Sequence, residues 1–127
     1  MRDWKVLLVD DEEEFVSTLA ERLALRGVEV RVANNGKEAL QKIEDDPPRV
    51  VVLDLMMPGL SGLEVLARIK RDYPAIEVIL LTGMARSNEA GEGMRQGAFA
   101  YLMKPLSIEK LMEKIGEAMK QHTGKVD

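Results

Sequence analysis

The residues best suited to chemistry in this sequence are acids, a hydroxyl and an amine that each follow a short apolar segment. Asp10 and Asp11 follow the first segment, Asp54 the third, Thr82 the fourth and Lys104 the fifth. Carboxylates brought close together repel one another, and a hard divalent cation with oxygen ligands, such as Mg²⁺, relieves that repulsion. A carboxylate beside such a cation can act as a nucleophile toward a phosphoryl group. The residue types therefore indicate phosphoryl transfer, in which Mg²⁺, Lys104 and Thr82 hold the phosphoryl oxygens.

Five short apolar segments alternate with five segments of helical periodicity, and these elements must position the reactive residues. The apolar segments are residues 6–9, 28–33, 50–53, 78–81 and 98–103. The helical segments are residues 15–23, 39–43, 63–70, 88–96 and 107–119. Residues 6–9 and 50–53 lack polar alternation, which is typical of strands buried on both faces, whereas residues 28–32 alternate strictly, as in an edge strand with one solvated face. The alternation predicts an α/β fold with a doubly wound parallel sheet.

The carboxyl ends of parallel strands meet at one edge of the sheet, so all the reactive residues are expected there. Each has an ordinary explanation when taken singly. The acidic run at residues 10–14 suits the first turn of a helix, Lys104 suits a solvated surface, and Thr82 suits a strand-end cap. The combination favours a site, because chance rarely brings an acid pair, an acid, a threonine and a lysine to four separate strand ends.

Composition and charge narrow the function classes. The 127 residues are 46% apolar and 31% charged, which suits one globular domain. The formal net charge of -4 argues against a surface that neutralises nucleic-acid phosphates, and the lack of cysteine excludes disulfides and thiolate metal sites. The first residues lack a signal-peptide core, and no stretch has the apolar length needed to cross a bilayer. We therefore expect a soluble, cytoplasmic protein with no membrane partner.

Four motifs resemble those of the receiver domains of bacterial two-component response regulators, the family that includes the chemotaxis regulator. They are VLLVDDE at residues 6–12, DLMMPGLSG at 54–62, LTG at 81–83 and GAFAYLMKP at 97–105. Their order and spacing match the family over nearly the whole chain. The resemblance implies a flavodoxin-like fold, a five-stranded parallel sheet of order 2-1-3-4-5 with five helices. It also implies a single receiver domain over residues 1–127, with a core at about 5–120 and a polar C-terminal tail at 121–127.

The resemblance assigns roles to the acidic residues. It implies that Asp54 is the phosphoacceptor. Asp11 and Asp54 are expected to ligate Mg²⁺ directly, together with the backbone carbonyl of Met56. Asp10 is expected to act mainly through water.

The resemblance also implies a switch. Lys104 is expected to bridge to the phosphate. Its peptide bond to Pro105 is expected to be cis, since proline makes that isomer accessible. Thr82 is expected to move toward the phosphoryl group and to let Tyr101 turn inward. Such a switch is a population shift between two states, biased by phosphate contacts that only one state offers. Three further motif residues, Pro58, Gly62 and Pro105, are expected to have structural roles and not chemical ones.

The resemblance implies two kinds of partner. The phosphoryl donor is expected to be a sensor histidine kinase, a phosphotransfer protein or a small phosphodonor, because His122 is the only histidine and lies in the predicted tail. The output is expected to be a downstream effector protein or domain, contacted through the fourth helix, fifth strand and fifth helix. A homodimer through that face, a phosphorelay intermediate and the excised receiver of a longer DNA-binding regulator are alternatives. No direct nucleic-acid binding by this domain is expected.

Two rival kinds of protein fit poorly. A phosphatase of the haloacid dehalogenase type normally has a second acid two residues after its nucleophile, and Met56 stands there. A flavodoxin needs a hydroxyl-rich phosphate loop after its first strand, where residues 10–14 are acidic. We therefore expect a signalling receiver that assists its own phosphorylation, not a dedicated enzyme. The resemblance implies that two positions flank the site, two residues after Asp54 and two residues after Thr82, and methionines occupy both, Met56 and Met84. Self-dephosphorylation should be slow, because neither side chain can orient an attacking water.

The fourth helical segment contains two glycines, Gly91 and Gly93. Together they weaken a helix by roughly 2 kcal/mol relative to alanine. One hypothesis is that this helix is partly unwound until phosphorylation orders it. The other is that the glycines allow close packing against a neighbouring element.

Overall fold

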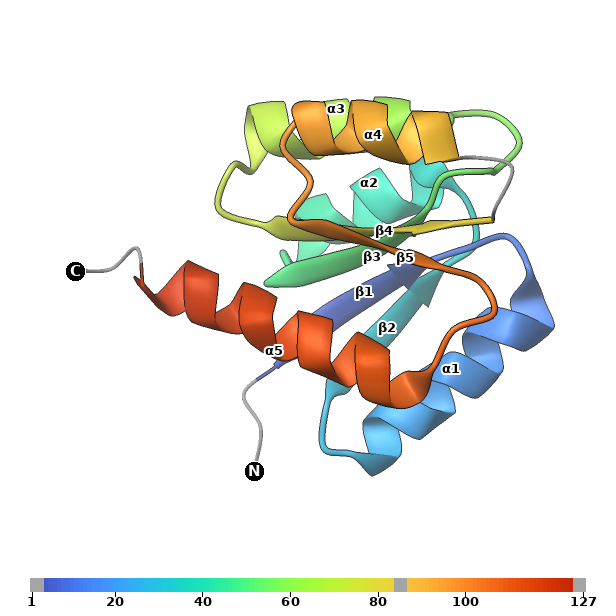
Figure 1. The fold of residues 1–127 in the computed structure, drawn as a ribbon, viewed down its shortest axis with the longest axis vertical. Coiled ribbons are helices and arrows are strands. Elements are labelled where there is room, and N and C mark those ends of the chain that lie inside the picture. Colours follow the sequence, from blue (N-terminus) through green and yellow to red (C-terminus); the bar gives the residue numbers. More distant parts are fainter. Residues whose placement is uncertain (1–3, 84–86, 125–127) are drawn as a thin grey trace.

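The structure, a computed structural model, describes residues 4–83 and 87–124. Five strands alternate with five helices within them (Figure 1). The strands are β1 Lys5–Val9, β2 Glu29–Ala33, β3 Val50–Asp54, β4 Glu77–Thr82 and β5 Ala100–Met103. The helices are α1 Glu13–Leu25, α2 Gly36–Asp45, α3 Gly62–Asp72, α4 Ser87–Arg95 and α5 Ile108–Gly124. Helix α5 thus continues past residue 120 into the segment for which the sequence predicted a polar tail.

The strands form one parallel sheet in the order β2-β1-β3-β4-β5, which confirms the predicted doubly wound, flavodoxin-like α/β fold. Strand β1 pairs with β2 on one side and with β3 on the other, so that Val6 lies opposite both Val30 and Val50. The chain therefore changes direction across the sheet after β2. In sheets of this kind, the crevice beyond the carboxyl ends of β1 and β3 is where ligands bind.

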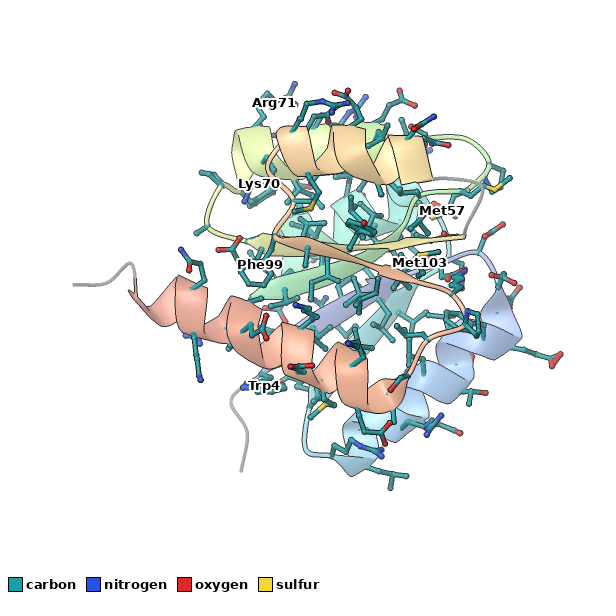
Figure 2. All side chains as sticks on the ribbon, in the orientation of Figure 1. Trp4, Met57, Lys70, Arg71, Phe99 and Met103 are labelled. Atoms are coloured by element: carbon teal, nitrogen blue, oxygen red, sulfur yellow. The ribbon has the colours of Figure 1, made fainter. Side chains whose placement is uncertain are left out.

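Helices α1 and α5 cover one face of the sheet, and α2, α3 and α4 cover the other (Figure 1). Side chains from a single strand enter both cores. Leu7 and Val9 pack on the side of α2 to α4, while Val6 and Leu8 pack on the side of α1 and α5. Figure 2 shows side chains filling both layers. This two-sided burial explains why β1 and β3 carry no polar alternation. No helix among the described residues is both long and apolar enough to span a bilayer.

Strand β2 is an edge strand, as its alternating sequence predicted, but its polar residue Arg31 is only partly exposed. The Arg31 guanidinium donates hydrogen bonds to the backbone carbonyls of Lys42 and Asp46, at the end of α2. Val30 and Val32 are also half-buried, on the side of α1 and α5. The predicted solvated face is therefore partly covered by contacts that Arg31 makes with α2.

Local capping explains where several helices begin. Ser61 and Glu64 form a capping box at α3, in which each side chain accepts a hydrogen bond from the other residue's backbone N–H. At α2, the Asn35 side chain accepts from the backbone N–H of Glu38. Ser107, the predicted cap of the last helix, accepts from the backbone N–H of Lys110 at 3.2 Å. These caps satisfy backbone donors that the first helical turn leaves unpaired.

Trp4, the only tryptophan, packs against α5 just before β1 begins (Figure 2). A Cβ atom built at Gly116 would lie 3.3 Å from the Trp4 ring, which is close to the limit of ordinary contact. The absence of a side chain at Gly116 therefore lets the indole lie directly on the helix.

The two glycines of α4 differ in their surroundings. The helix is formed over Ser87–Arg95, so the unwound state that we hypothesised is not the one observed. A Cβ atom at Gly93 would overlap Leu80 Cδ1 in the buried core, which fits the close-packing hypothesis. A Cβ atom at Gly91 would lie 3.9 Å from Arg95 Nη1, its nearest described neighbour beyond the helix's own backbone. Gly91 therefore has no packing role that alanine would disturb.

Alanine substitutions at these glycines should have opposite effects. Gly91→Ala should raise the free energy of unfolding by about 1 kcal/mol, because alanine is the better helix former. Gly93→Ala should lower it by about 1–3 kcal/mol, because Leu80 must leave its packed position. Urea denaturation of both variants measures the difference. Equal effects at the two positions would contradict the packing argument.

Candidate functional site

The strands deliver the predicted reactive residues to the same edge of the sheet. Asp10 follows β1, Asp54 ends β3, Thr82 ends β4 and Lys104 follows β5. Backbone hydrogen bonds to neighbouring strands fix the positions of two of these residues along the edge of the sheet. The Asp10 N–H donates to the Ala33 carbonyl at 3.1 Å, and the Lys104 N–H donates to the Thr82 carbonyl at 2.9 Å. The expectation of a single reactive edge is therefore met.

Asp54 is held by the loop that follows it. Its side chain is almost fully buried, and its Oδ1 accepts a hydrogen bond from the Met56 N–H at 3.3 Å. The loop turns at Gly59, which has φ +79°. It closes at Gly62, whose N–H donates to the Leu55 carbonyl at 3.3 Å.

Gly62 has a packing role at the start of α3. A Cβ atom there would lie 2.6 Å from the Asp54 carbonyl oxygen and 2.6 Å from Leu55 Cα. Both neighbours are backbone atoms at the end of the strand that carries Asp54, so neither can move without displacing that strand end. Glycine thus allows α3 to begin directly against the backbone of Asp54, which gives a physical reason for its predicted structural role.

A cleft of about 630 Å³ opens above the strand ends. Its lining residues are Asp11, Glu12, Asp54, Met56, Met57, Pro58, Gly83 and Lys104. Thr82 is 1% exposed and does not line this cleft, whereas the next residue, Gly83, does. Its hydroxyl donates a hydrogen bond to the Gly83 carbonyl at 3.0 Å. Met84, named in the lifetime prediction, lies outside the described residues.

Three carboxylates gather closely enough to share one cation. Oxygens of Asp10, Glu12 and Asp54 all lie within 4.8 Å of one another. Asp10 Oδ2 is buried, and the Lys104 ammonium lies 2.9 Å from it. An all-oxygen donor set of this kind fits a hard cation such as Mg²⁺. Asp11, predicted as a direct ligand, is exposed and lines the cleft but is not one of these three residues.

The Lys104 ammonium lies among the same carboxylates. Its Nζ is 2.6 Å from Glu12 Oε1, 2.9 Å from Asp10 Oδ2 and 3.8 Å from Asp54 Oδ2. The Asp10 contact joins the ammonium to a buried carboxylate, so Lys104 offsets part of the buried negative charge. The peptide bond between Lys104 and Pro105 is cis, as the resemblance predicted.

The electrostatics of the cluster disfavour the charge on Asp54. Burial, followed by the repulsion of Asp10, raises the pKa of Asp54 to about 6, against the lowering effect of Lys104. Burial lowers the pKa of Lys104, but its contacts with Glu12 and Asp10 outweigh burial, so the Lys104 pKa is raised overall. The single positive charge of Lys104 therefore does not balance the negative charge of the three carboxylates.

Tyr101, the second predicted switch residue, lies on β5 with 45% of its surface exposed. It borders a separate hollow with Met103, Pro105 and the start of α5. The inward turn of Tyr101 thus stays a prediction for the phosphorylated state.

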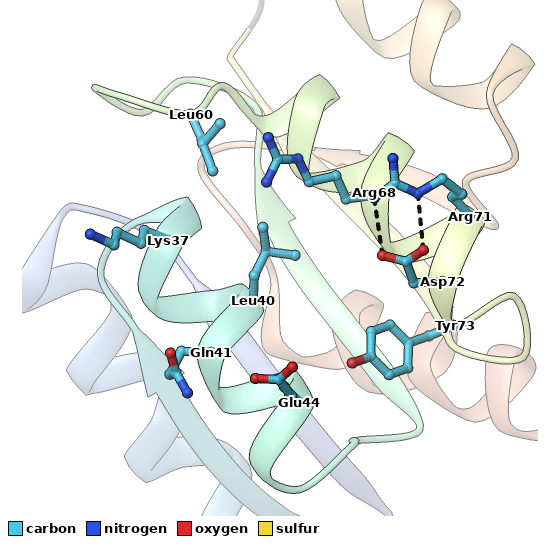
Figure 3. Close-up of a pocket in the computed structure, with 9 residues that line it drawn as sticks. All are labelled: Lys37, Leu40, Gln41, Glu44, Leu60, Arg68, Arg71, Asp72 and Tyr73. Atoms are coloured by element: carbon cyan, nitrogen blue, oxygen red, sulfur yellow. Dashed lines mark hydrogen bonds and ion pairs between the residues drawn. The ribbon is translucent and has the colours of Figure 1, made fainter.

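Another hollow lies between α2 and α3, away from the acidic cluster (Figure 3). It has a volume of about 310 Å³. Its lining residues are Lys37, Leu40, Gln41, Glu44, Leu60, Arg68, Arg71, Asp72 and Tyr73. Arg71 and Asp72 form two hydrogen bonds at its rim. None of the predicted site residues lines this hollow.

Glu12 is the site residue for which the sequence predicted no role. It belongs to the first motif, directly after the acid pair, and this adjacency to a strand end was the available signal. Its partner Lys104 is 92 positions away, so only the folded chain brings the two together.

A family model of the response regulator receiver domain matches residues 6–116. The chain belongs to this family. Receiver domains are signalling modules of two-component systems, and the fold and motif predictions are confirmed at that level.

Curated relatives of this receiver domain are longer regulators. The transcriptional regulatory protein YkoG of Bacillus subtilis is 36% identical over 127 residues, which are 100% of this chain and 56% of the relative. Response regulator MprA of Mycolicibacterium vanbaalenii is 34% identical over 94% of this chain and 52% of the relative. Regulatory protein AtoC of Escherichia coli is 37% identical over 84% of this chain and 23% of the relative. The chain thus spans about half or less of the length of these proteins.

Solved structures agree with this assignment. A response regulator receiver domain from Clostridium thermocellum superposes with a TM-score of 0.91 at 34% identity, covering 94% of this chain and 97% of that one. The receiver domain of NtrX from Brucella abortus gives a TM-score of 0.87 at 32% identity, covering 91% of this chain and 98% of that one.

Proposed function

We propose that this receiver domain accepts one phosphoryl group on Asp54 and passes the resulting change to an effector. The observation that carries the proposal is the approach of Lys104 Nζ to within 3.8 Å of Asp54 Oδ2 in an open cleft. A buried nucleophile beside an ammonium, at the rim of a cleft, suits attack on a dianionic phosphoryl group.

In the proposed step, an Asp54 carboxylate oxygen forms a bond to phosphorus while the bond between phosphorus and the donor breaks. The electron pair of the broken bond leaves with the donor. Lys104 neutralises charge on the phosphoryl oxygens without giving up a proton. Thr82 moves toward them and donates a hydrogen bond from its hydroxyl, which in the present structure is bonded to the Gly83 carbonyl. Asp11, Asp54 and the Met56 carbonyl are the proposed direct cation ligands, and Asp10 is proposed to act mainly through water. Bound Mg²⁺ would offset the charge that the carboxylates and the phosphoryl group bring together.

The proposed donor is a histidine kinase, a phosphotransfer protein or a small acyl phosphate. The proposed output surface is formed by α4, β5 and α5, where Tyr101 is exposed and Thr82 lies buried at the end of the neighbouring strand β4. Because the curated relatives are longer regulators, we favour an effector domain on the same protein. A separate effector, a homodimer and a phosphorelay role are the alternatives.

The intact mass of the protein tests the acceptor. After incubation with Mg²⁺ and acetyl phosphate, wild type should gain one phosphoryl group and Asp54→Asn should gain none. Asp72→Asn, which changes an exposed aspartate of α3, should behave as wild type. Failure of wild type to gain mass, or equal labelling of Asp54→Asn, would refute the proposal.

The phosphoryl group should be lost slowly from this domain. Met56 is 58% exposed at the rim of the cleft and offers no group that can orient a water. Met56→Asn should therefore shorten the half-life of the phosphoprotein roughly tenfold, because an amide can position the attacking water. The decay of the phosphorylated mass after removal of the donor gives the rate. Met94→Asn, at an exposed position of α4, is the control, and equal decay in both variants would contradict the argument.

A further inference from the structure

Lys104 lies nearer to Glu12 and Asp10 than to Asp54. Its ammonium is 1.2 Å closer to Glu12 than to Asp54, from the distances of 2.6 and 3.8 Å. The Glu12 side chain is 62% exposed, whereas Asp10 and Asp54 are buried. The shortest contact of the ammonium is thus with Glu12, the exposed carboxylate of the three. Water can therefore solvate Glu12 if this contact breaks.

Phe15 completes the surroundings of this ammonium. Its ring centroid lies 4.6 Å from Lys104 Nζ, within the range of a cation–π contact. Glu12 precedes α1 as its cap residue, and Phe15 follows in the first turn. Residues three apart lie on the same side of a helix start, so one short segment supplies both a charge and a ring to Lys104.

These two contacts have different consequences for phosphoryl transfer. The phosphoryl oxygens need the Lys104 ammonium, and a charged hydrogen bond to Glu12 competes for it. The Phe15 ring does not compete in this way, because it holds a cation by its face and leaves the N–H groups free to donate. The ring therefore keeps the ammonium over the cleft whether or not Glu12 is bound.

We propose that Glu12 is a positioning residue that retains Lys104 in the unphosphorylated domain, and that Lys104 exchanges Glu12 for a phosphoryl oxygen as Asp54 is phosphorylated. The proposal rests on the phosphorylation of Asp54. Glu12 then slows phosphorylation, because each transfer requires the Lys104–Glu12 pair to break. Phe15 limits how far the released ammonium moves.

Rates of phosphorylation by acetyl phosphate, followed by intact mass at saturating Mg²⁺, test this exchange. Glu12→Gln should react two- to fivefold faster than wild type, roughly the range that an exposed ion pair sustains. Glu12→Asp keeps the charge but is one methylene too short for the 2.6 Å contact, so it should also react faster, by a smaller factor. Glu14→Gln makes the same charge change in the first turn of α1 and should leave the rate at the wild-type value.

Two further measurements separate the alternatives. In Glu12→Gln/Phe15→Leu, most of the gain in rate should disappear, with urea denaturation used to establish that the variant is folded. The Mg²⁺ concentration for half-maximal rate should be no higher in Glu12→Gln than in wild type. A higher Mg²⁺ requirement would make Glu12 a metal ligand and overturn the proposal.

Other outcomes also decide the matter. Equal rates for wild type and Glu12→Gln would overturn the exchange while leaving Asp54 phosphorylation intact. Equal acceleration by Glu12→Gln and Glu14→Gln, with Glu12→Asp at the wild-type rate, would show an effect of net charge alone. A wild-type protein that gains no mass would refute the proposed function itself, and the exchange with it.

Discussion

The Asp54→Asn variant should be more stable than wild type at pH 7 without Mg²⁺. Folding raises the pKa of Asp54 from its ordinary value of 3.8 to about 6, so the ionised form present at pH 7 is disfavoured in the folded state. A neutral amide of the same shape avoids that penalty. A shift of this size corresponds to at most about 3 kcal/mol, and the cost of burying the polar amide reduces the expected gain to about 1–2 kcal/mol.

The gain should depend on pH in a defined direction. Between about pH 4 and 6 the folded protein holds a proton on Asp54 that the unfolded chain has lost, so wild-type stability falls as the pH rises through this window. Below pH 4 both states are protonated and the Asp54 contribution is fully favourable. The advantage of Asp54→Asn should therefore be largest at pH 7 and should vanish by about pH 4.

Urea denaturation at several pH values, with EDTA present, measures this advantage. Asp72→Asn is the control with the opposite sign, because the hydrogen bond from Arg71 lowers the pKa of Asp72. That substitution should give no gain at pH 7. A gain at Asp54 that is absent, or that persists unchanged at pH 4, would rule out charge burial as its cause.

Removal of the Lys104 charge should have a larger effect, and in the opposite direction: a loss of stability. Lys104→Met leaves the carboxylates of Asp10, Glu12 and Asp54 without the cation that contacts all three. Loss of one partner of a buried ion pair costs about 3–5 kcal/mol, and the partial exposure of Lys104 brings the expected loss to about 2–4 kcal/mol. Methionine keeps most of the aliphatic volume, so packing contributes little to this loss.

Mg²⁺ should restore much of that stability. A divalent cation bound by the folded state stabilises it in proportion to the logarithm of its concentration, and the extra negative charge in Lys104→Met favours its binding. Millimolar Mg²⁺ should therefore raise the denaturation midpoint of Lys104→Met more than that of wild type, and EDTA should reverse the effect. Lys114→Met, which breaks an exposed pair with Glu117, should lose little stability and show the wild-type response to Mg²⁺. An equal Mg²⁺ response in the two lysine variants would mean that the acids do not form a cation site.

The sequence was sufficient for the architecture because the core strands carry an unambiguous pattern. Residues 6–9 and 50–53 are apolar without interruption. Such a pattern is typical of short strands that are buried on both faces, because every side chain then leaves water. Placing Asp10, Asp54 and Lys104 at one edge then followed from the direction of parallel strands. Those predictions depend on the local apolar pattern and on the direction of the strands, and both can be inferred from the sequence alone.

Other features depend on contacts between distant residues and were not predictable in this way. Gly91 and Gly93 look equivalent in the sequence, yet only Gly93 faces Leu80. Arg31 looks like the solvated residue of an alternating strand, yet its guanidinium bonds to carbonyls at the end of α2. Glu12 was placed in a motif without a role because the position of its partner is set by β5 and the turn that follows.

The contact between Trp4 and Gly116 gives the protein a built-in optical reporter. Indole emission responds to the polarity of its surroundings, and this indole leans on the middle of α5, the helix that leads toward the C-terminus. Because the chain has no second tryptophan, a change in emission can be assigned to that one place. Displacement of the last helix, whether by a partner or by a following domain, can thus be followed in solution without attaching a dye.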